Sequence, residues 1–411
     1  MMAFNINRRH FGVALTLGAT LTNTSAHSED VSDGVVRIGL LLDMSGPYSD
    51  IGGAGSVLAA RMAVEDFGGT VLGKPVEIIF ADHQNKPDIA STKAREWFDT
   101  QKVDAITDVA SSATAIAVVN VGRDKNKPVL IAAAAGGTSR LTNEDCGPIS
   151  AHWTYNTQTL ANVTARAVTK AGGDSWFFIT ADYTFGHSLE QDTAAVVKAA
   201  GGQVLGSVRH PLNASDFSSF IMQAQASKAK VIALANAGAD TIGAIKAAND
   251  FGLTQSGKSL VGLLMYISDV HALGLRLTQG MLITEGFYWD LNNETRAWSK
   301  RFFERHKRMP TSAQAGEYSA VMHYLKAVKA AGTNETAAVM AKMRELPVND
   351  IFAHGGRVRP DGSMVHSMFL TQVKKPSESH YPWDYLTIKA VVPPEQAFQP
   401  LAESRCPLVK R

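Results

Sequence analysis

A serine in a glycine-framed turn is the first candidate for chemistry in this sequence. The letters GHSLE at residues 186–190 lack only the last glycine of the G-x-S-x-G pattern, which presents a nucleophilic serine directly after a strand. Glu190 stands where close packing would exclude a long side chain, and several residues separate Ser188 from the predicted strand that ends at Thr180. We therefore expect Ser188 to be an ordinary first-turn residue of a helix, not the nucleophile of a hydrolase.

Other reactive patterns are also incomplete. The glycines of SGPYSDIGGAGS at residues 45–56 lack the G-x-G-x-x-G spacing of a dinucleotide-binding turn, and no phosphate-binding P-loop motif occurs. His187 and Glu190 find no companions that would complete a metal site. The sequence therefore predicts no catalytic residue, no metal and no cofactor.

The elements that must position any binding residues alternate between buried strands and amphipathic helices. Such alternation is typical of parallel sheets covered by helices on both faces. Two features argue against a single barrel. The alternation is interrupted near residues 150–158. A turn of Pro-Asp-Gly type at 360–362 is expected to join two late strands, at 357–363 and 368–373. The fold class predicted is α/β, with two doubly wound Rossmann-like lobes. The predicted parallel strands cover residues 35–42, 76–81, 105–109, 129–134, 176–180, 204–208, 231–235, 260–265 and 281–284.

The first 26 residues read as an export signal. Arg8 and Arg9 precede a mildly apolar stretch and the small residues Thr24-Ser-Ala26, which indicates a twin-arginine signal; a general signal with two arginines is the alternative. Its removal leaves 38 of the 40 basic residues against 38 acidic ones, a balance that argues against nucleic acid as a partner. We expect a soluble periplasmic protein.

Only two cysteines occur, Cys146 and Cys406. In an oxidising compartment they predict one disulfide that ties the C-terminal tail to the body of the protein. Two unpaired buried thiols are the alternative.

Six stretches, in this order, resemble the periplasmic solute-binding proteins of the branched-chain amino acid ABC transporter type. The resemblance spans essentially the whole mature chain. The stretches TEGFYWDLN and HWTYN also resemble the aromatic-acid-binding members of this family, a more tentative match. The six stretches are VRIGLLLDMSGPYSDIGGAG (36–55), GKPVEIIFADHQNKPDIASTKAREW (73–97), VDAITDVASSATAIAV (103–118), KPVLIAAAAGGTSRLT (127–142), DYTFGHS (182–188) and QGMLITEGFYWD (279–290).

The resemblance implies a type I periplasmic binding protein, a two-lobed clamp that closes on one small solute and delivers it to permease subunits. Three hinge crossings are expected near residues 150–158, 284–291 and 345–355. Residues 27–155 plus 287–348 would form the first lobe, and 156–286 plus 349–411 the second. The chain is expected to be a monomer without a cofactor, and the same clamp serving as the sensing module of a membrane receptor is the alternative.

Ligands of such folds lie beyond the carboxyl ends of the strands. The family grips a carboxylate with the loops at 110–113 and 134–138, which points to Ser111, Ser112, Ala134, Ala135 and Gly136 in this chain. Aromatic side chains on the remaining cleft loops would cover a flat ligand. These are Tyr48, Tyr155, Tyr183, Phe185 and Tyr266. The alternative is that either group merely packs a tight joint or the core.

The family's amino-acid binders supply acidic residues to the ligand's ammonium group, and this sequence departs from that pattern. Asn156 stands where those binders tend to have an aspartate, and Asp269 can equally cap a helix. An unpaired buried ammonium costs several kcal/mol. The sequence therefore favours a small aromatic acid, benzoate- or cinnamate-like, as ligand; an amino acid, or another small acid or amide, is the alternative.

Overall fold

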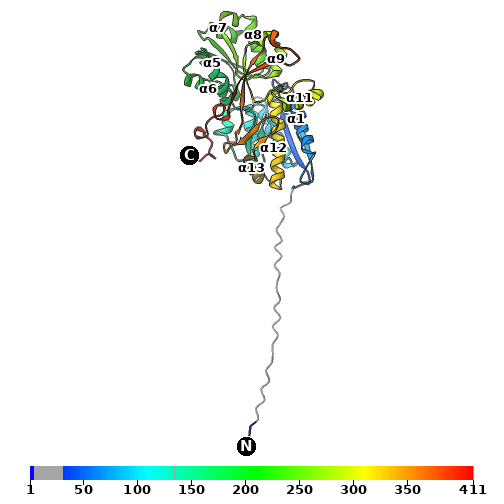
Figure 1. The fold of residues 1–411 in the computed structure, drawn as a ribbon. Coiled ribbons are helices and arrows are strands. Elements are labelled where there is room, and N and C mark those ends of the chain that lie inside the picture. The colour runs from blue at the N-terminus through cyan, green and yellow to red at the C-terminus, as the bar shows by residue number, and fades with distance from the viewer. Residues whose placement is uncertain (4–30, 133–135, 411) are drawn as a thin grey trace.

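The computed structural model describes residues 1–3, 31–132 and 136–410. The predicted export signal after residue 3, and Ala134 and Ala135 among the predicted ligand-binding residues, lie outside the described residues. Two helix-covered sheets make up most of the fold, which is the predicted α/β class (Figure 1). Of the part of the chain that is described, no helix combines the length and apolar character needed to cross a membrane.

The first lobe is built on a six-stranded sheet in the order β2-β3-β1-β4-β5-β6. All neighbours run parallel except the short β2. Successive side chains of β1 point to opposite faces, so Leu40 packs toward α1 and α12 while Leu41 packs toward α2 and α3. The strands are β1 (Val36–Leu42), β2 (Thr70–Val71), β3 (Lys74–Asp82), β4 (Ala105–Asp108), β5 (Val129–Ile131) and β6 (Ser150–His152). The helices are α1 (Gly53–Phe67), α2 (Pro87–Asp99), α3 (Ser112–Lys125), α11 (Asn293–His306), α12 (Ser312–Ala331) and α13 (Thr336–Glu345).

The second lobe is built on a parallel sheet in the order β10-β9-β7-β8. Phe178 of β7 packs toward α6, and Ile179 packs on the opposite face toward α7 and α8. The strands are β7 (Ser175–Ala181), β8 (Gln203–His210), β9 (Val231–Ala235) and β10 (Ser259–Gly262). The helical segments are α4 (Thr157–Leu160), the π-helical turn η2 (Ala161–Ala165), α5 (Arg166–Lys170), α6 (Thr184–Ala199), α7 (Ser218–Ala226), α8 (Ala239–Asp250), α9 (Ile267–Leu273) and α10 (Leu275–Thr278).

The late strands pair differently from the sequence prediction. The turn at residues 360–362 joins β13 (His354–Val358) to the two-residue β14 (Met364–Val365), which completes a small sheet with β12 (Val348–Asn349). The strand β15 (Met368–Val373) pairs instead with β11 (Leu282–Glu285) and β16 (Leu386–Val392), both antiparallel. The prediction that 281–284 is a parallel strand was wrong, because its neighbour runs back from the far end of the chain.

The division of the chain into lobes remains a prediction, and packing favours a later third crossing than 345–355. Phe352, Val358 and Met364 belong to the same apolar cluster as β1 and α12 of the first lobe. Met368 packs with the second lobe. The chain therefore passes between the lobes at about residues 366–367 on this packing.

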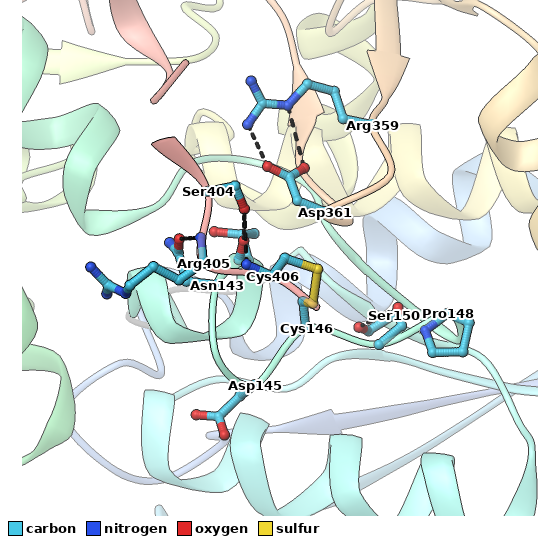
Figure 2. The surroundings of a disulfide bond; sticks show 12 residues. Asn143, Asp145, Cys146, Pro148, Ser150, Arg359, Asp361, Ser404, Arg405 and Cys406 are labelled. Carbon is cyan, nitrogen blue, oxygen red and sulfur yellow. Dashed lines mark hydrogen bonds and ion pairs between the residues drawn. A yellow bond between two sulfur atoms is a disulfide. The ribbon is translucent and has the colours of Figure 1, made fainter. Parts of the chain in front are cut away.

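The C-terminal tail is held to the first lobe by the predicted disulfide. Cys146 and Cys406 are bonded, with their Cα atoms 5.7 Å apart (Figure 2). Beside this bond the backbone N–H of Arg405 donates to the side chain of Asn143 at 2.8 Å, and the Ser404 hydroxyl accepts from the Cys406 N–H at 3.1 Å. Because β16 belongs to the second lobe, the tail, with α14 (Pro394–Ala397), joins the two lobes covalently.

Replacing Cys406 by serine removes this crosslink. We expect the free energy of unfolding to fall by about 2–4 kcal/mol, because the disulfide closes a long loop in the unfolded chain. Urea denaturation of the oxidised protein and the variant measures the difference. A reductant should bring the wild type to the stability of Cys406→Ser and leave the variant unchanged; equal urea midpoints for the two oxidised proteins would contradict the expectation.

Candidate functional site

The loops at the carboxyl ends of the strands of both lobes meet one another. The carbonyl of Pro47, in the loop after β1, accepts from the backbone N–H of Ala239 at the start of α8 at 3.1 Å. The hydroxyl of Thr138, in the loop after β5, lies 2.7 Å from that of Ser188 on α6. A cavity of about 370 Å³ is lined by residues 45–47 and 84–86 of one lobe and 212–213 of the other. The loops of the two lobes are therefore in direct contact.

Four tyrosines link the two sides in hydroxyl pairs. Tyr48 is hydrogen-bonded to Tyr183, and Tyr155 to Tyr266 at 2.6 Å between the hydroxyl oxygens. Burial raises the pKa of Tyr48 and of Tyr266, so both keep their protons near neutral pH. Phe185 is fully buried beside Tyr183, with ring centroids 6.2 Å apart. The structure thus brings together all five aromatic residues that the sequence predicted as a cover for the ligand.

Gly137 explains why this aromatic group can close. A Cβ atom at this position would lie 2.8 Å from the ring of Tyr155 and 3.2 Å from that of Phe185. Real Cβ atoms do not come as close as 2.8 Å, and 3.2 Å is tighter than most of their contacts, so the glycine leaves room for both rings. Gly137 therefore has a packing reason here.

The loop after β4 carries Ser111 and Ser112 in a strained backbone. Asp108, Val109 and Ser111 have φ angles of 66°, 58° and 73°. Positive φ is costly for residues other than glycine, above all for a β-branched one, and such strain gathers at functional sites. Both serines are buried, and the Ser112 hydroxyl accepts from the backbone N–H of Thr138 at 3.1 Å. This bond joins the two loops predicted to grip a carboxylate.

Of the remaining predicted residues, Gly136 is buried in the loop that precedes Thr138. Asn156 caps α4, because its side-chain oxygen accepts from the backbone N–H of Thr159 at 2.9 Å. Whether the loop residues contact a ligand stays a prediction.

Ser188 has no relay that would activate it. His187 pairs with Asp182 at 2.7 Å, and Glu190 accepts from the Thr180 hydroxyl at 2.6 Å, so neither prepares the serine as a nucleophile. The serine lies in the second turn of α6 rather than the first. Among the described residues, no group of three or more histidine, cysteine, aspartate or glutamate side chains could hold a metal ion.

Buried acids border the aromatic group, among them Asp269 and Glu285, and sequence reasoning missed Glu285. Asp269 lies in the first turn of α9, which begins three residues earlier than the predicted start at Val270, and its side chain accepts from the backbone N–H of Tyr266 at 3.0 Å. Burial raises the pKa of Asp269 to about 7. Glu285, at the end of β11, was not singled out, although an acid at the end of an apolar strand is the signal that could have found it. Burial raises its pKa to about 8. Of these acids, only Asp269 was considered from the sequence, and Glu285 acts electrostatically on the same Tyr266.

A second acidic pair lies inside the first lobe. Burial raises the pKa of Asp108 to about 7, and burial together with the nearby Asp108 raises that of Glu317. The Thr107 hydroxyl donates to Glu317 at 2.9 Å. Asp108 is the first residue of the strained loop that carries Ser111 and Ser112. This loop therefore begins at an acid that is partly protonated near neutral pH.

Comparison with known proteins places this architecture. A family model described as periplasmic binding protein matches residues 35–378. The crystal structure of a periplasmic binding protein from Burkholderia mallei is 52% identical in sequence, with a TM-score of 0.90. The match covers 92% of this chain and 100% of that chain. A branched chain amino acid ABC transporter periplasmic ligand-binding protein from Burkholderia xenovorans is 40% identical, with a TM-score of 0.82. The match covers 91% of this chain and 100% of that chain. A Rhodopseudomonas palustris solute-binding protein in complex with 3,4-dihydroxybenzoic acid shares the fold at 19% identity, with a TM-score of 0.78. The match covers 89% of this chain and 98% of that chain.

Replacing Asp108 by asparagine tests its protonation. An acid with a raised pKa keeps, in the folded protein, a proton that the unfolded chain loses near pH 4, so the free energy of unfolding falls as pH rises from about 4 to about 7. We expect Asp108→Asn to reduce this fall by about 1–2 kcal/mol, measured by urea denaturation at pH 5 and pH 8. The exposed Asp88→Asn is the control. Identical pH dependence in Asp108→Asn and the wild type would show that Asp108 is ionised throughout.

Proposed function

Because this chain belongs to the periplasmic binding protein family, we propose that it captures a small aromatic carboxylic acid, benzoate- or cinnamate-like, for an ABC importer. Its relatives are solute-binding proteins and not enzymes. They are periplasmic proteins that hand a small molecule to permease subunits. The identity of the solute and the residues that contact it are the parts proposed here.

The observation that carries the proposal is the aromatic group contributed by both sides of the cleft. Tyr48 and Tyr155 face Tyr183 and Tyr266 in the two hydroxyl pairs, and Phe185 completes the group. Flat rings stack on a flat ligand and exclude water from it. An aliphatic side chain would leave part of this aromatic surface without a matching partner.

The carboxylate end of the solute would lie at the start of α3. Helix N-termini carry free backbone N–H groups and a partial positive charge that favour anions. Ser111 and Ser112 stand at this end of α3, and the loop that contains Gly136 meets it through the bond between Thr138 and Ser112. Ala134 and Ala135 belong to the same proposed subsite.

The mechanism follows from the position of the site between the lobes. A solute shifts the clamp toward its closed form only if it binds that form more tightly than the open one. Groups on both lobes must therefore contact it: the α3 end holds the carboxylate, and the tyrosines of the second lobe cover the ring. The permease would recognise the closed form.

An amino acid is the second candidate ligand, supported by the name of the 40% identical Burkholderia xenovorans protein. The buried Glu285 beside the aromatic group could serve an ammonium group if it were ionised. Use of the same clamp as the sensing module of a membrane receptor differs only in its partner.

Thermal denaturation of the mature protein with candidate solutes tests the ligand class. Specific binding raises the melting temperature with ligand concentration. We expect benzoate- or cinnamate-type acids to raise it and leucine, isoleucine and valine to leave it unchanged. The reverse pattern would show that the chain binds amino acids.

Replacing Tyr183 by alanine tests the aromatic cover. We expect the affinity for the aromatic acid to fall by about tenfold or more, because a ring that covers the ligand is lost, and Tyr183→Phe to lose less. Isothermal titration calorimetry measures both. Tyr381→Ala, an exposed tyrosine remote from the hydroxyl pairs, is the control. Unchanged affinity in Tyr183→Ala would remove this residue from the site.

A further inference from the structure

Glu285 occupies an unusual position for an acid. It ends β11, where the chain returns toward the first lobe, and only 2% of its surface is exposed. Ser312, in the first turn of α12, lies close enough to the carboxyl group to lower its pKa against the effect of burial. The carboxyl oxygen Oε2 is buried and has no hydrogen-bond partner among the described residues. Such an atom is costly to leave unpaired, so a partner is expected from outside the chain.

The surroundings of Glu285 connect it to the proposed ligand site. Tyr266 is close enough for its ionisation to be affected by Glu285, and its hydroxyl is paired with that of Tyr155. Ala313, the neighbour of Ser312, belongs to the same apolar cluster as Tyr48, Tyr155 and Tyr266. Glu285 thus borders the aromatic group, whereas the proposed carboxylate subsite lies at α3.

Resting on the proposed function, we infer that Glu285 determines specificity by donating a hydrogen bond, as an uncharged carboxylic acid, to a ring hydroxyl of the bound aromatic acid. The solute class is then a hydroxybenzoate or hydroxycinnamate. The carboxylate of the solute would bind at the N-terminus of α3, and its ring hydroxyl would accept a hydrogen bond from Oε2 of Glu285.

The charges around Glu285 favour a neutral partner over an ammonium group. The described groups whose ionisation or hydrogen bonding is linked to that of Glu285 are Ser312 from α12, and Tyr266 and Asp269 at the start of α9, and none of these three is a cation. With a pKa of about 8, Glu285 holds its proton at neutral pH. An ammonium ligand would first have to displace this proton, which weakens its binding about tenfold for each pH unit below 8. A hydroxyl group meets the protonated acid directly.

The test is calorimetric titration of the mature wild type, Glu285→Gln and Glu285→Ala with 4-hydroxycinnamate, cinnamate and leucine at pH 6.0 and pH 8.5. We expect wild-type affinity for 4-hydroxycinnamate to fall about fourfold at the higher pH, because about a quarter of Glu285 is then protonated. Glu285→Gln keeps a neutral donor, so its affinity should stay within about threefold of the wild type at pH 6.0 and show no such fall. Glu285→Ala should lose about tenfold at pH 6.0, and binding of cinnamate should lose much less.

Glu304→Gln, an exposed acid on α11, is the matched control. Ionisation of the ligand's own phenol affects wild type and Glu285→Gln alike, so the comparison cancels it. Equal binding of 4-hydroxycinnamate by all variants at both pH values would overturn the role of Glu285 and leave the aromatic-acid function standing. Binding of leucine that strengthens with pH and is lost in Glu285→Gln would assign Glu285 to an ammonium and overturn both proposals. No binding of either aromatic acid would overturn the proposed ligand class and this inference with it.

Discussion

The parallel direction of the strands in both main sheets decides where this protein can bind a solute. Parallel strands place all their carboxyl ends at one edge, so the loops after β1, β4 and β5 gather on one side of the first lobe. The loops after β7, β9 and β10 gather in the same way on the second. The two edges meet where Pro47 and Thr138 of the first lobe contact Ala239 and Ser188 of the second.

Burial determines the electrostatics of that gap. Asp108, Asp269 and Glu285 have raised pKa values because they are removed from water without a cation beside them. Raised pKa values reduce the negative charge that Asp108, Asp269 and Glu285 carry at neutral pH. An anionic solute that meets backbone N–H groups is then repelled less by these three acids. A cationic ligand group would pair with one of these acids only after the acid had lost its proton, which weakens binding below the acid's pKa.

Much of this organisation is readable from the sequence, and the failures have physical causes. Apolar runs such as 36–42 and 231–235 identify buried strands because both of their faces are covered, and the aromatic cleft residues follow from the rule on strand ends. The partner of β15 was not readable, because antiparallel pairing with β11 joins residues almost 90 positions apart and no short turn marks it. Glu285 was missed for a related reason: its burial depends on α12 and α9, which are distant in sequence.

The disulfide raises the question of how a clamp can open when its tail is bonded to the opposite lobe. Thirteen residues lie between Val392, at the end of β16, and Cys406. An extended chain spans about 3.3–3.6 Å per residue, so the fourteen steps from Val392 to Cys406 span roughly 46–50 Å in all. The tail uses part of this length in α14 and in its turns, and hydrogen bonds to Asn162, Asn143 and Arg359 hold it further. Ala397 and Phe398 of the tail are also buried, so an opening that moved the tail would have to break these contacts. The disulfide itself acts mainly on the unfolded chain, whose freedom it reduces.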